Sequence, residues 1–306
     1  MKLRIATLFL TLTLAANCFA AVPYIVVLGT AQDAGVPQMG CDTPFCRRAW
    51  ADPGLAETVS SIALVDPRSG GRWIFDATPD LPEQFQYLKG VTGDPGNRLD
   101  GIFLTHAHIG HYTGLMYLGR ESMNASAVRT YAMPRMKLML EQNAPWSQLV
   151  SLRNIALTAI FDKTPVKLAD DITVEPFLVP HRDEFSETVG FRITARGRKL
   201  VFIPDIDKWE KWPVSLAELV RDSDHLLIDG TFFADGEIAR PMSEVPHPFV
   251  AETMKLLAGL SKADRAKVIF THFNHSNPLV QRDKKAAAAV ESKGFRIARR
   301  GMRIEL

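Results

Sequence analysis

The sequence has almost no excess of charge of either sign. Its 306 residues include 36 lysines and arginines and 34 aspartates and glutamates. Lys2 and Arg4 are the only charged residues among the first twenty, so the rest of the chain is formally neutral. A protein that binds a polyanion needs a basic excess to attract phosphate groups. The balance therefore argues against nucleic acid as a partner.

Long apolar runs, repeats and low-complexity segments are absent from most of the chain. After the first twenty residues no apolar run reaches the roughly 18 residues that a membrane-spanning helix needs. Charged residues make up 23% of the sequence and hydrophobic residues 46%, which excludes a disordered or fibrous protein. No linker divides the chain, and we expect residues 21–306 to form a single domain that needs no disulfide to fold.

The first twenty residues have the pattern of an export signal. The positive segment MKLR precedes IATLFLTLTLAA, an uncharged run too short to cross a bilayer. We expect residues 1–20 to be a signal peptide cut after Ala20, and the mature protein to be periplasmic or secreted, without stable membrane insertion. The alternatives are a buried first strand, an uncleaved anchor, or a lipoprotein cut before Cys18, where Asn17 fits poorly.

Cysteine is scarce, and several catalytic motifs are missing. With Cys18 in the signal, only Cys41 and Cys46 remain, five residues apart. In an oxidising compartment they are a disulfide candidate, but half of a structural metal site and two free thiols remain alternatives. The absence of GxSxG, GK[ST] and GxGxxG argues against a serine-hydrolase elbow, a phosphate-binding loop and a dinucleotide-binding turn.

Short apolar runs predict many strands with helices between them. The expected strands cover residues 24–28, 61–65, 73–75, 101–105, 172–179, 188–195, 199–203, 226–229 and 268–271. The expected helices cover 81–88, 249–260 and 279–292, and residues 295–306 fit two edge strands about a glycine. Strands mixed with helices in both halves of the chain indicate an α/β layered domain with two sheets.

The strongest feature is the segment THAHIGH, which follows the predicted strand GIFL and contains His106, His108 and His111. Three histidines so close together are improbable by chance in a chain that has eight. On a helix the first two would point about 200° apart, but on a loop leaving a strand they can converge on one point. Imidazole suits zinc and iron alike, so this segment predicts a metal site.

Three more polar residues stand directly after predicted strands. His181 follows ITVEPFLV, Asp205 follows KLVFI and His272 follows KVIF. In layered α/β proteins, sites are built at the C-terminal ends of strands. Because two histidines are too few to hold a catalytic metal, we expect these residues to join the histidine segment in one site.

With these segments in place, the chain resembles the metallo-β-lactamase fold, whose hallmark is a THxHxDH loop after a strand. More narrowly, it resembles the pyrroloquinoline-quinone biosynthesis protein B family and its phosphodiesterase relatives. The resemblance spans residues 28 to 278 and rests on LGTAQDAGVPQMGC, FLTHAHIGHYTGLM, VPHRDEFSETVGFRI, LLIDGTFF and FTHFNHSNP. It implies a four-layer αββα sandwich, which accounts for two sheets.

The resemblance also implies a set of ligands for one or two zinc ions, with iron(II) or manganese as alternatives. The first site would use His106, His108 and His181. The second would use His111, Asp205 and His272, with Asp205 bridging. Asp76, in FDATPD, matches an acidic residue that supports the ligand loop by hydrogen bonding, which orients ligands and raises their basicity.

One position departs from the family pattern. Gly110 stands where the THxHxDH aspartate would be, and that aspartate normally binds the second metal. Three histidines still suffice for a mononuclear catalytic zinc, and the remaining His111, His272 and Asp205 are also a ligand set of non-haem iron enzymes. Asp33, in the loop after the first strand, is a candidate replacement, although a turn aspartate is the interpretation that the sequence favours.

Relatives carry a Cys-x-Cys-x-x-Cys zinc site after the first strand, and its middle cysteine is Thr43 here. That loss favours a disulfide between Cys41 and Cys46, while a structural zinc would need another ligand such as His275.

Five other residues fit structural roles. His225 and His247 are read as structural or pocket-lining. Phe232, Phe233 and Trp209 fit core packing better than an apolar pocket wall.

The first functional hypothesis is an exported metal-dependent hydrolase of a small molecule, acting on an ester, lactone, amide or phosphodiester. The metal would lower the pKa of its bound water, and Asp205 would hold or deprotonate that water. The second is a metal-dependent oxygenase or hydroxylase linked to quinone-cofactor biosynthesis, against which export argues. The third is a non-catalytic carrier on a degenerate scaffold.

Overall fold

The computed structural model describes residues 21–239 and 241–306. The predicted signal peptide, residues 1–20, lies outside this part of the chain. Among the helices of the described residues, none combines the length and the apolar character that a membrane span requires.

The first sheet has seven strands in the order β14-β1-β2-β3-β4-β5-β6. Neighbours from β14 to β3 pair antiparallel, and neighbours from β3 to β6 pair parallel. The strands are β1 (Tyr24–Gly29), β2 (Ser61–Asp66), β3 (Gly71–Phe75), β4 (Gly101–Phe103), β5 (Val128–Ala132), β6 (Ile155–Ala159) and β14 (Arg303–Glu305).

The second sheet repeats this plan, with seven strands in the order β13-β12-β11-β10-β9-β8-β7. Neighbours from β7 to β10 pair antiparallel, and neighbours from β10 to β13 pair parallel. The strands are β7 (Val166–Ala169), β8 (Ile172–Leu178), β9 (Val189–Ala195), β10 (Arg198–Ile203), β11 (His225–Asp229), β12 (Val268–Thr271) and β13 (Arg296–Ile297).

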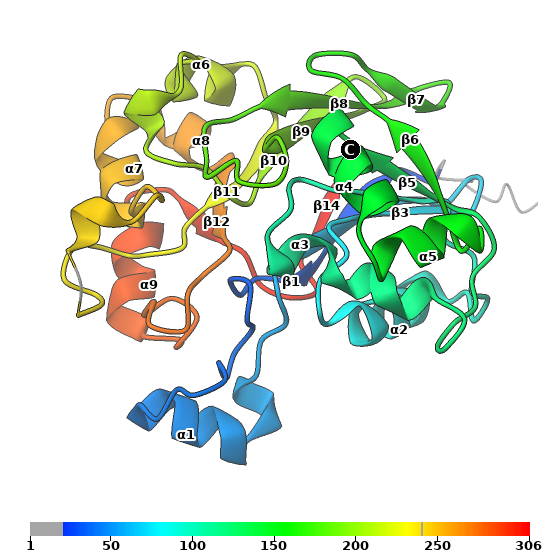
Figure 1. The fold of residues 1–306 in the computed structure, drawn as a ribbon. Helices are drawn as coiled ribbons and strands as arrows, with labels where there is room; N and C mark the ends of the chain where they lie inside the picture. The colour runs from blue at the N-terminus through cyan, green and yellow to red at the C-terminus, as the bar shows by residue number, and fades with distance from the viewer. Residues whose placement is uncertain (1–20, 240) are drawn as a thin grey trace, which may run out of the picture.

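Helices cover the outer face of each sheet (Figure 1). The α-helices are α1 (Pro44–Ala51), α2 (Leu81–Thr92), α3 (Ile109–Tyr112), α4 (Pro134–Gln142), α5 (Trp146–Ser151), α6 (Leu216–Arg221), α7 (Val250–Leu256), α8 (Lys262–Arg265) and α9 (Lys284–Glu291). The 3-10 helices are η1 (Pro53–Leu55), η2 (Thr113–Leu118), η3 (Trp209–Lys211) and η4 (Met242–Glu244). Side chains of α2, α4 and α5 pack on the first sheet, and those of α6, α7 and α9 pack on the second.

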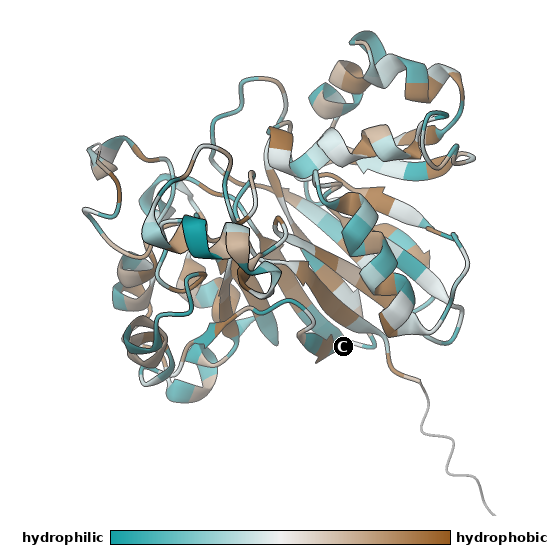
Figure 2. Ribbon diagram, turned by 90° about the horizontal axis from the view of Figure 1, so that it is seen from below, coloured by the Kyte–Doolittle hydropathy of each residue, from teal (hydrophilic) through white to brown (hydrophobic). Residues whose placement is uncertain are grey.

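Strand β1 shows why the sheets need cover on both faces. All six of its residues are buried. Ile25 and Val27 point into the core between the sheets, with Phe75 and Phe202, while Val26 and Leu28 pack under the helices. Strands that are apolar on both faces are typical of sheets covered on both sides, and Figure 2 shows hydrophobic strands stacked inside the molecule. The expected four-layer αββα sandwich is confirmed.

Several boundaries differ from those predicted by the sequence. The helix expected from 279 begins at Lys284, because the Asp283 side chain caps it by accepting from the backbone N–H of Ala286 at 2.7 Å. The helix expected over 249–260 is α7, which ends at Leu256. The two C-terminal edge strands are present, but they lie at the edges of different sheets.

Helix α1 projects from the sandwich at the end of the loop that follows β1 (Figure 1). Cys41 and Cys46 form a disulfide at its start, with an S–S distance of 2.04 Å. Thr43 caps the helix by accepting from the backbone N–H of Cys46 at 3.2 Å. Phe45 and Ala49 pack into the core beside the second sheet. The disulfide hypothesis is the one that the structure shows, and the described residues contain no cysteine cluster suited to a metal.

Candidate metal centre

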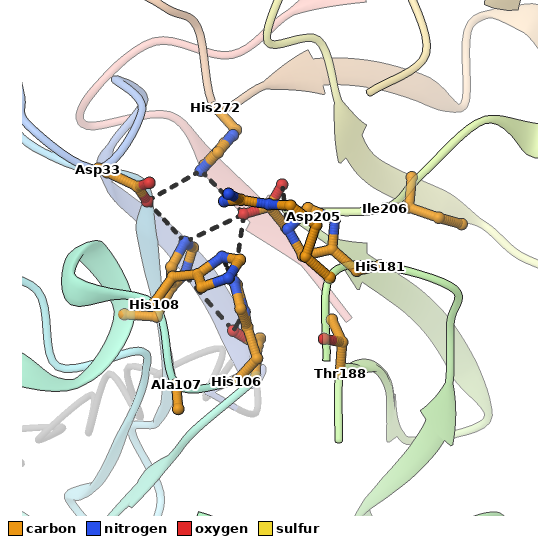
Figure 3. A network of polar contacts seen from close by, with 12 residues as sticks. Asp33, His106, Ala107, His108, His181, Thr188, Asp205, Ile206 and His272 are labelled. Atoms are coloured by element: carbon orange, nitrogen blue, oxygen red, sulfur yellow. Dashed lines mark hydrogen bonds and ion pairs between the residues drawn. The ribbon is translucent and has the colours of Figure 1, made fainter. Parts of the chain in front are cut away.

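The six predicted ligand residues converge at one edge of the sandwich (Figure 3). Both sheets contribute, because the carboxyl ends of their parallel strands meet there. From the first sheet, the loop after β4 carries His106 and His108, and α3 carries His111. From the second sheet, His181 follows β8, Asp205 follows β10 and His272 follows β12.

A first group consists of His106, His108, His181 and Asp205, whose candidate ligand atoms all lie within 4.8 Å of one another. His106 Nε2 lies 2.8 Å from His108 Nδ1 and 3.3 Å from Asp205 Oδ2. His181 Nε2 lies 3.6 Å from Asp205 Oδ1. Three imidazoles and a carboxylate around one point are a donor set that suits zinc.

A second group shares Asp205 with the first and adds Asp33, His111 and His272. His111 Nε2 lies 3.3 Å from Asp205 Oδ2 and 3.1 Å from Asp33 Oδ1. His272 Nε2 lies 3.7 Å from Asp205 Oδ2 and 3.8 Å from Asp33 Oδ1. Asp205 thus lies between the two groups, as its predicted bridging role requires. Asp33 stands in a turn, as the sequence favoured, and its carboxylate also lies within this group of candidate ligand atoms.

In His106, His111 and His272, the Nδ1 atom contacts a neighbouring polar side chain. Asp76 lies behind His111, with 2.7 Å between Oδ2 and Nδ1, and accepts a hydrogen bond from the backbone N–H of Thr105. The Thr105 hydroxyl lies 2.9 Å from His106 Nδ1, and the Thr231 hydroxyl lies 2.8 Å from Nδ1 of His272. Such partners fix the tautomer and ring orientation of metal-ligating histidines. The supporting role expected for Asp76 agrees with these contacts.

Two of these residues have an unusual backbone. Asp76 has a φ of 68° and His272 a φ of 62°, in the left-handed region that residues other than glycine rarely adopt. Both side chains are fully buried. Such strain costs of order 1–3 kcal/mol and persists only where the surrounding structure demands it, most often at functional sites.

His247 is a member of the site that the sequence analysis had assigned only a structural or pocket-lining role. Its Nδ1 lies 2.8 Å from Asp229 Oδ2 and 3.0 Å from Asp205 Oδ1. Asp229 also accepts from the backbone N–H groups of Ile206 and Thr231 and from the Thr231 hydroxyl. Because these contacts use the lone pairs of Asp229, we read the His247–Asp229 pair as support for Asp205. The segment LLIDGTFF was the only sequence pattern that pointed here.

Burial and neighbouring charges set the protonation states of the site. Burial, together with the positive charge of His111, holds the pKa of His106 well below its ordinary value. Burial lowers the pKa of His181 to about 4. Both imidazoles are therefore neutral at pH 7, the form that binds metal. Burial opposes ionisation of Asp205, but the surrounding histidines hold its pKa well below the usual range.

His247 has the opposite behaviour. Burial alone would lower its pKa, but the carboxylates of Asp229 and Asp205 raise the pKa to about 10. Burial would also lower the pKa of His111, but the neighbouring carboxylates raise it well above its ordinary value, and a bound metal would displace that proton. The supporting role of His247 therefore rests on its contacts with Asp229 and Asp205.

Unpaired buried atoms show that the site suits a metal ion. Asp33 Oδ1, Asp205 Oδ1, His111 Nε2 and His272 Nε2 are buried without a hydrogen-bond partner in the described structure, and so are both ring nitrogens of His181. Leaving such atoms unpaired costs about 1–3 kcal/mol each. Cations bound between them would satisfy these atoms except Nδ1 of His181, because one imidazole directs a single nitrogen at a given ion, so the residues present fit one or two zinc ions.

The other candidates lie in less reactive surroundings. His225 begins β11, at the end of that strand opposite Asp229. Trp209 is core, and its indole N–H donates to the Thr253 hydroxyl at 2.8 Å. Phe232 is buried with its ring centroid 6.1 Å from that of His247, and Phe233 packs against the core. Of Trp209, Phe232 and Phe233, Phe232 is the residue that lies beside a histidine of the site.

The fold and the site define a class. A family model described as Beta-lactamase superfamily domain matches residues 72–273, and the chain belongs to that family.

Within that class, proteins of one name match most of the chain. Coenzyme PQQ synthesis protein B of Methylorubrum extorquens (strain PA1) is 28% identical over 92% of this chain and 100% of its own. The protein of the same name from Methylobacterium nodulans is 29% identical over 92% of this chain and 99% of its own. The resemblance to this family predicted from the sequence is confirmed.

Solved structures agree on the fold. Zinc-bound PqqB from Methylobacterium extorquens has a TM-score of 0.76 at 24% identity and covers 92% of this chain and 100% of its own. A diphosphatase of the PhnP family has a TM-score of 0.66 at 20% identity, over 93% of this chain and 97% of its own. Human tRNase Z, short form, has a TM-score of 0.56 at 16% identity, over 92% and 98% respectively.

Proposed function

We propose that this protein is a metal-dependent hydrolase of a small molecule, with zinc as the resident metal. The observation that carries the proposal is the set of buried, unpaired nitrogen and oxygen atoms that face one another across Asp205. Hydrolases among the structural neighbours, such as the diphosphatase, and a zinc-bound neighbour support it.

Each residue has a distinct task in this proposal. His106, His108 and His181 would hold one ion, and His111 and His272 a second, with Asp205 between them. Bound metal would supply a Lewis acid and a water whose pKa falls toward about 7. Asp205 stays ionised because its carboxyl pKa lies well below the usual range, so it is placed to accept a hydrogen bond from that water and hold it in position.

The substrate would approach beside His108. Its side chain is 12% exposed, whereas those of His106, His111, His181 and His272 are 0–1% exposed. Glu184 lies 3.0 Å from His108 Nε2 and is itself 45% exposed. The formally neutral body of the chain favours a small molecule over nucleic acid, and the bond is an ester, lactone, amide or phosphodiester.

The double variant H106A/H108A tests the proposal. We expect it to lose the zinc of the first group, measured by elemental analysis of protein purified without chelators, and to lose hydrolysis of a panel of small esters, lactones and phosphodiesters. Asp170→Asn, at a fully exposed side chain between β7 and β8, is the control. Full zinc content in the double variant would overturn the proposal.

A second candidate function is an iron-dependent oxygenase or hydroxylase. Two histidines and a carboxylate occur together at His111, His272 and Asp205, which is a ligand set of non-haem iron enzymes. The named role of the PQQ synthesis relatives gives this candidate its context. Anaerobic loading with iron(II), followed by oxygen-uptake measurements with quinone-cofactor precursors, separates the two: no uptake favours the hydrolase. Absence of bound metal altogether would favour a carrier.

We also propose that the protein acts outside the cytoplasm, from the export pattern of residues 1–20. Fractionation of cells that express the full chain, with mass spectrometry of the mature N-terminus, tests this. The expected product begins at Ala21 in the periplasm or medium, and an intact N-terminus in the cytoplasm would refute it.

A further inference from the structure

Any side chain at position 110 would clash with Asp33. A Cβ atom at Gly110 would lie 2.4 Å from Asp33 Oδ1, 2.5 Å from Asp33 Cα and 2.9 Å from Asp33 Cβ. The Cα and Cβ atoms of Asp33 do not move when its side chain rotates, so rotation cannot relieve the contact. The φ of Gly110 is not in the left-handed region, so close approach is the reason for glycine here.

The loop that carries Asp33 is fixed by the segment that carries His272. The backbone N–H of Gln32 donates to the carbonyl of Phe273 at 2.8 Å, and the N–H of Phe273 donates to the carbonyl of Thr30 at 2.7 Å. The Asn274 side chain also donates to that of Gln32. Because Asp33 and His272 each adjoin a residue of this pairing, the two side chains are positioned together.

The carboxylate of Asp33 does not stabilise the turn in which it stands. No backbone N–H in the described structure donates to its carboxylate, which excludes an Asx turn. Its Oδ1 is buried, and although it lies 3.1 Å from His111 Nε2, neither atom makes a hydrogen bond. Two unpaired atoms at this distance, with His272 Nε2 also unpaired and 3.8 Å from Oδ1, face a shared point.

We propose that Asp33 is the carboxylate ligand of the second metal ion, supplied from the loop after β1 in place of the aspartate that the THxHxDH pattern carries at position 110. The inference rests on the proposed function, because it concerns the same centre. Gly110 is then the steric condition for this arrangement: the family carboxylate and Asp33 occupy the same space, so a chain has one or the other. The site is dinuclear despite the departure from the family pattern.

A ligand exchange tests this inference without reference to activity. Wild-type protein, D33A, the exchange variant D33G/G110D and the control D42N, at an exposed aspartate of the same loop, are stripped, reloaded with zinc and desalted, and their zinc is counted by elemental analysis. We expect two zinc ions per chain for the wild type and D42N, and one for D33A, whose second ion binds at least tenfold to a hundredfold more weakly. The exchange variant should not regain the second ion, because a Cβ atom at position 110 would still lie 2.5 Å from the Cα atom of residue 33.

Cobalt(II) substitution gives a second readout, because the visible absorption of cobalt reports its ligands. D33A and D33G/G110D should both lose the absorption that the second equivalent adds, whereas D42N should keep it. If D33A keeps two tightly bound ions, the inference fails while the proposed function stands. If the wild type binds a single zinc ion, and the H106A/H108A variant loses it, the inference also fails while the proposed function stands. If the wild type binds none, both fail. G110A serves as a steric check: it should lose the second ion although it removes no ligand.

Discussion

Asp205 belongs to both groups of candidate ligands and to a third cluster, which it forms with Asp229, His247 and His272. One oxygen faces His106 and His111 at 3.3 Å each, and the other faces His247 at 3.0 Å and His181 at 3.6 Å. A buried carboxylate among imidazoles is stable only because the partners offset its desolvation. The single side chain thereby links the chemistry of both proposed ions.

The first residue-scale prediction concerns Asp76, which supports His111 from behind. Asp76→Asn keeps the shape, and asparagine tolerates the left-handed backbone at this position. Losing the carboxylate should weaken zinc binding in the second group about tenfold to a hundredfold, measured by competition with a chelating dye. Zinc affinity unchanged from that of the D170N control would show that Asp76 serves the fold alone.

The second residue-scale prediction concerns Glu57, whose side chain has a buried oxygen without a hydrogen-bond partner. Burial raises the pKa of this carboxyl to about 7, despite opposing charges from Arg300 and Arg282. Between pH 4.5 and 7 the native state therefore holds a proton that the unfolded chain has lost, so the free energy of unfolding falls as pH rises. Glu57→Gln should raise that free energy by about 1–3 kcal/mol at pH 8 and change it little at pH 4.

Urea unfolding of the wild type and Glu57→Gln at both pH values checks this. The exposed Glu121→Gln is the matched control. Equal stability of the Glu57 variant and the wild type at pH 8 would show that Glu57 ionises in the native state without penalty.

At the scale of elements, two loops from different sheets define the second group. The loop after β1 and the segment after β12 pair through Ala31 and Phe273. The pairing joins residues that are far apart in sequence, so the position of Asp33 depends on the whole sandwich. Helix α1, at the far end of the same loop, is instead held locally by the disulfide.

The disulfide therefore should stabilise the protein without forming the site. Replacing both cysteines (C41S/C46S) should lower the free energy of unfolding by about 2 kcal/mol, from the lost constraint on a short loop. The zinc content should stay at the wild-type value, because the pairing of Gln32 with Phe273 holds Asp33. Treatment of the wild type with a reductant should reproduce both results. A loss of zinc on reduction would contradict this account.

The sequence predicted the strands with a clear apolar run or alternation, and it missed β5, β6 and β7. Strands β1, β4 and β12 are uninterrupted buried runs, and the last four residues of β10 are buried as well. Strands β6 and β7, near one end of the sandwich, are mostly half-buried and give a weak pattern.

The site residues divide in the same way. His106, His181, Asp205 and His272 follow strands and were predicted from that position. Asp33 could not be assigned, because its proximity to Gly110 exists only in three dimensions.

At the scale of the whole molecule, the two sheets have the same design, and both halves of each supply the site, since Asp33 follows the antiparallel strand β1 and His181 the antiparallel strand β8. The ends of β3 and β4 bring Asp76 and the histidine loop, and the ends of β10 and β12 bring Asp205 and His272. The sandwich thus creates one shared edge where side chains from distant segments meet. The proposed small-molecule substrate would reach the site beside His108, whose side chain is 12% exposed.

An anomalous difference map, measured at the zinc absorption edge from crystals of the zinc-loaded protein, tests the central claim most directly. The account predicts two peaks: one among His106, His108 and His181, and one among Asp33, His111 and His272, with Asp205 between them. A single peak, or a second peak that Asp33 does not contact, would contradict it.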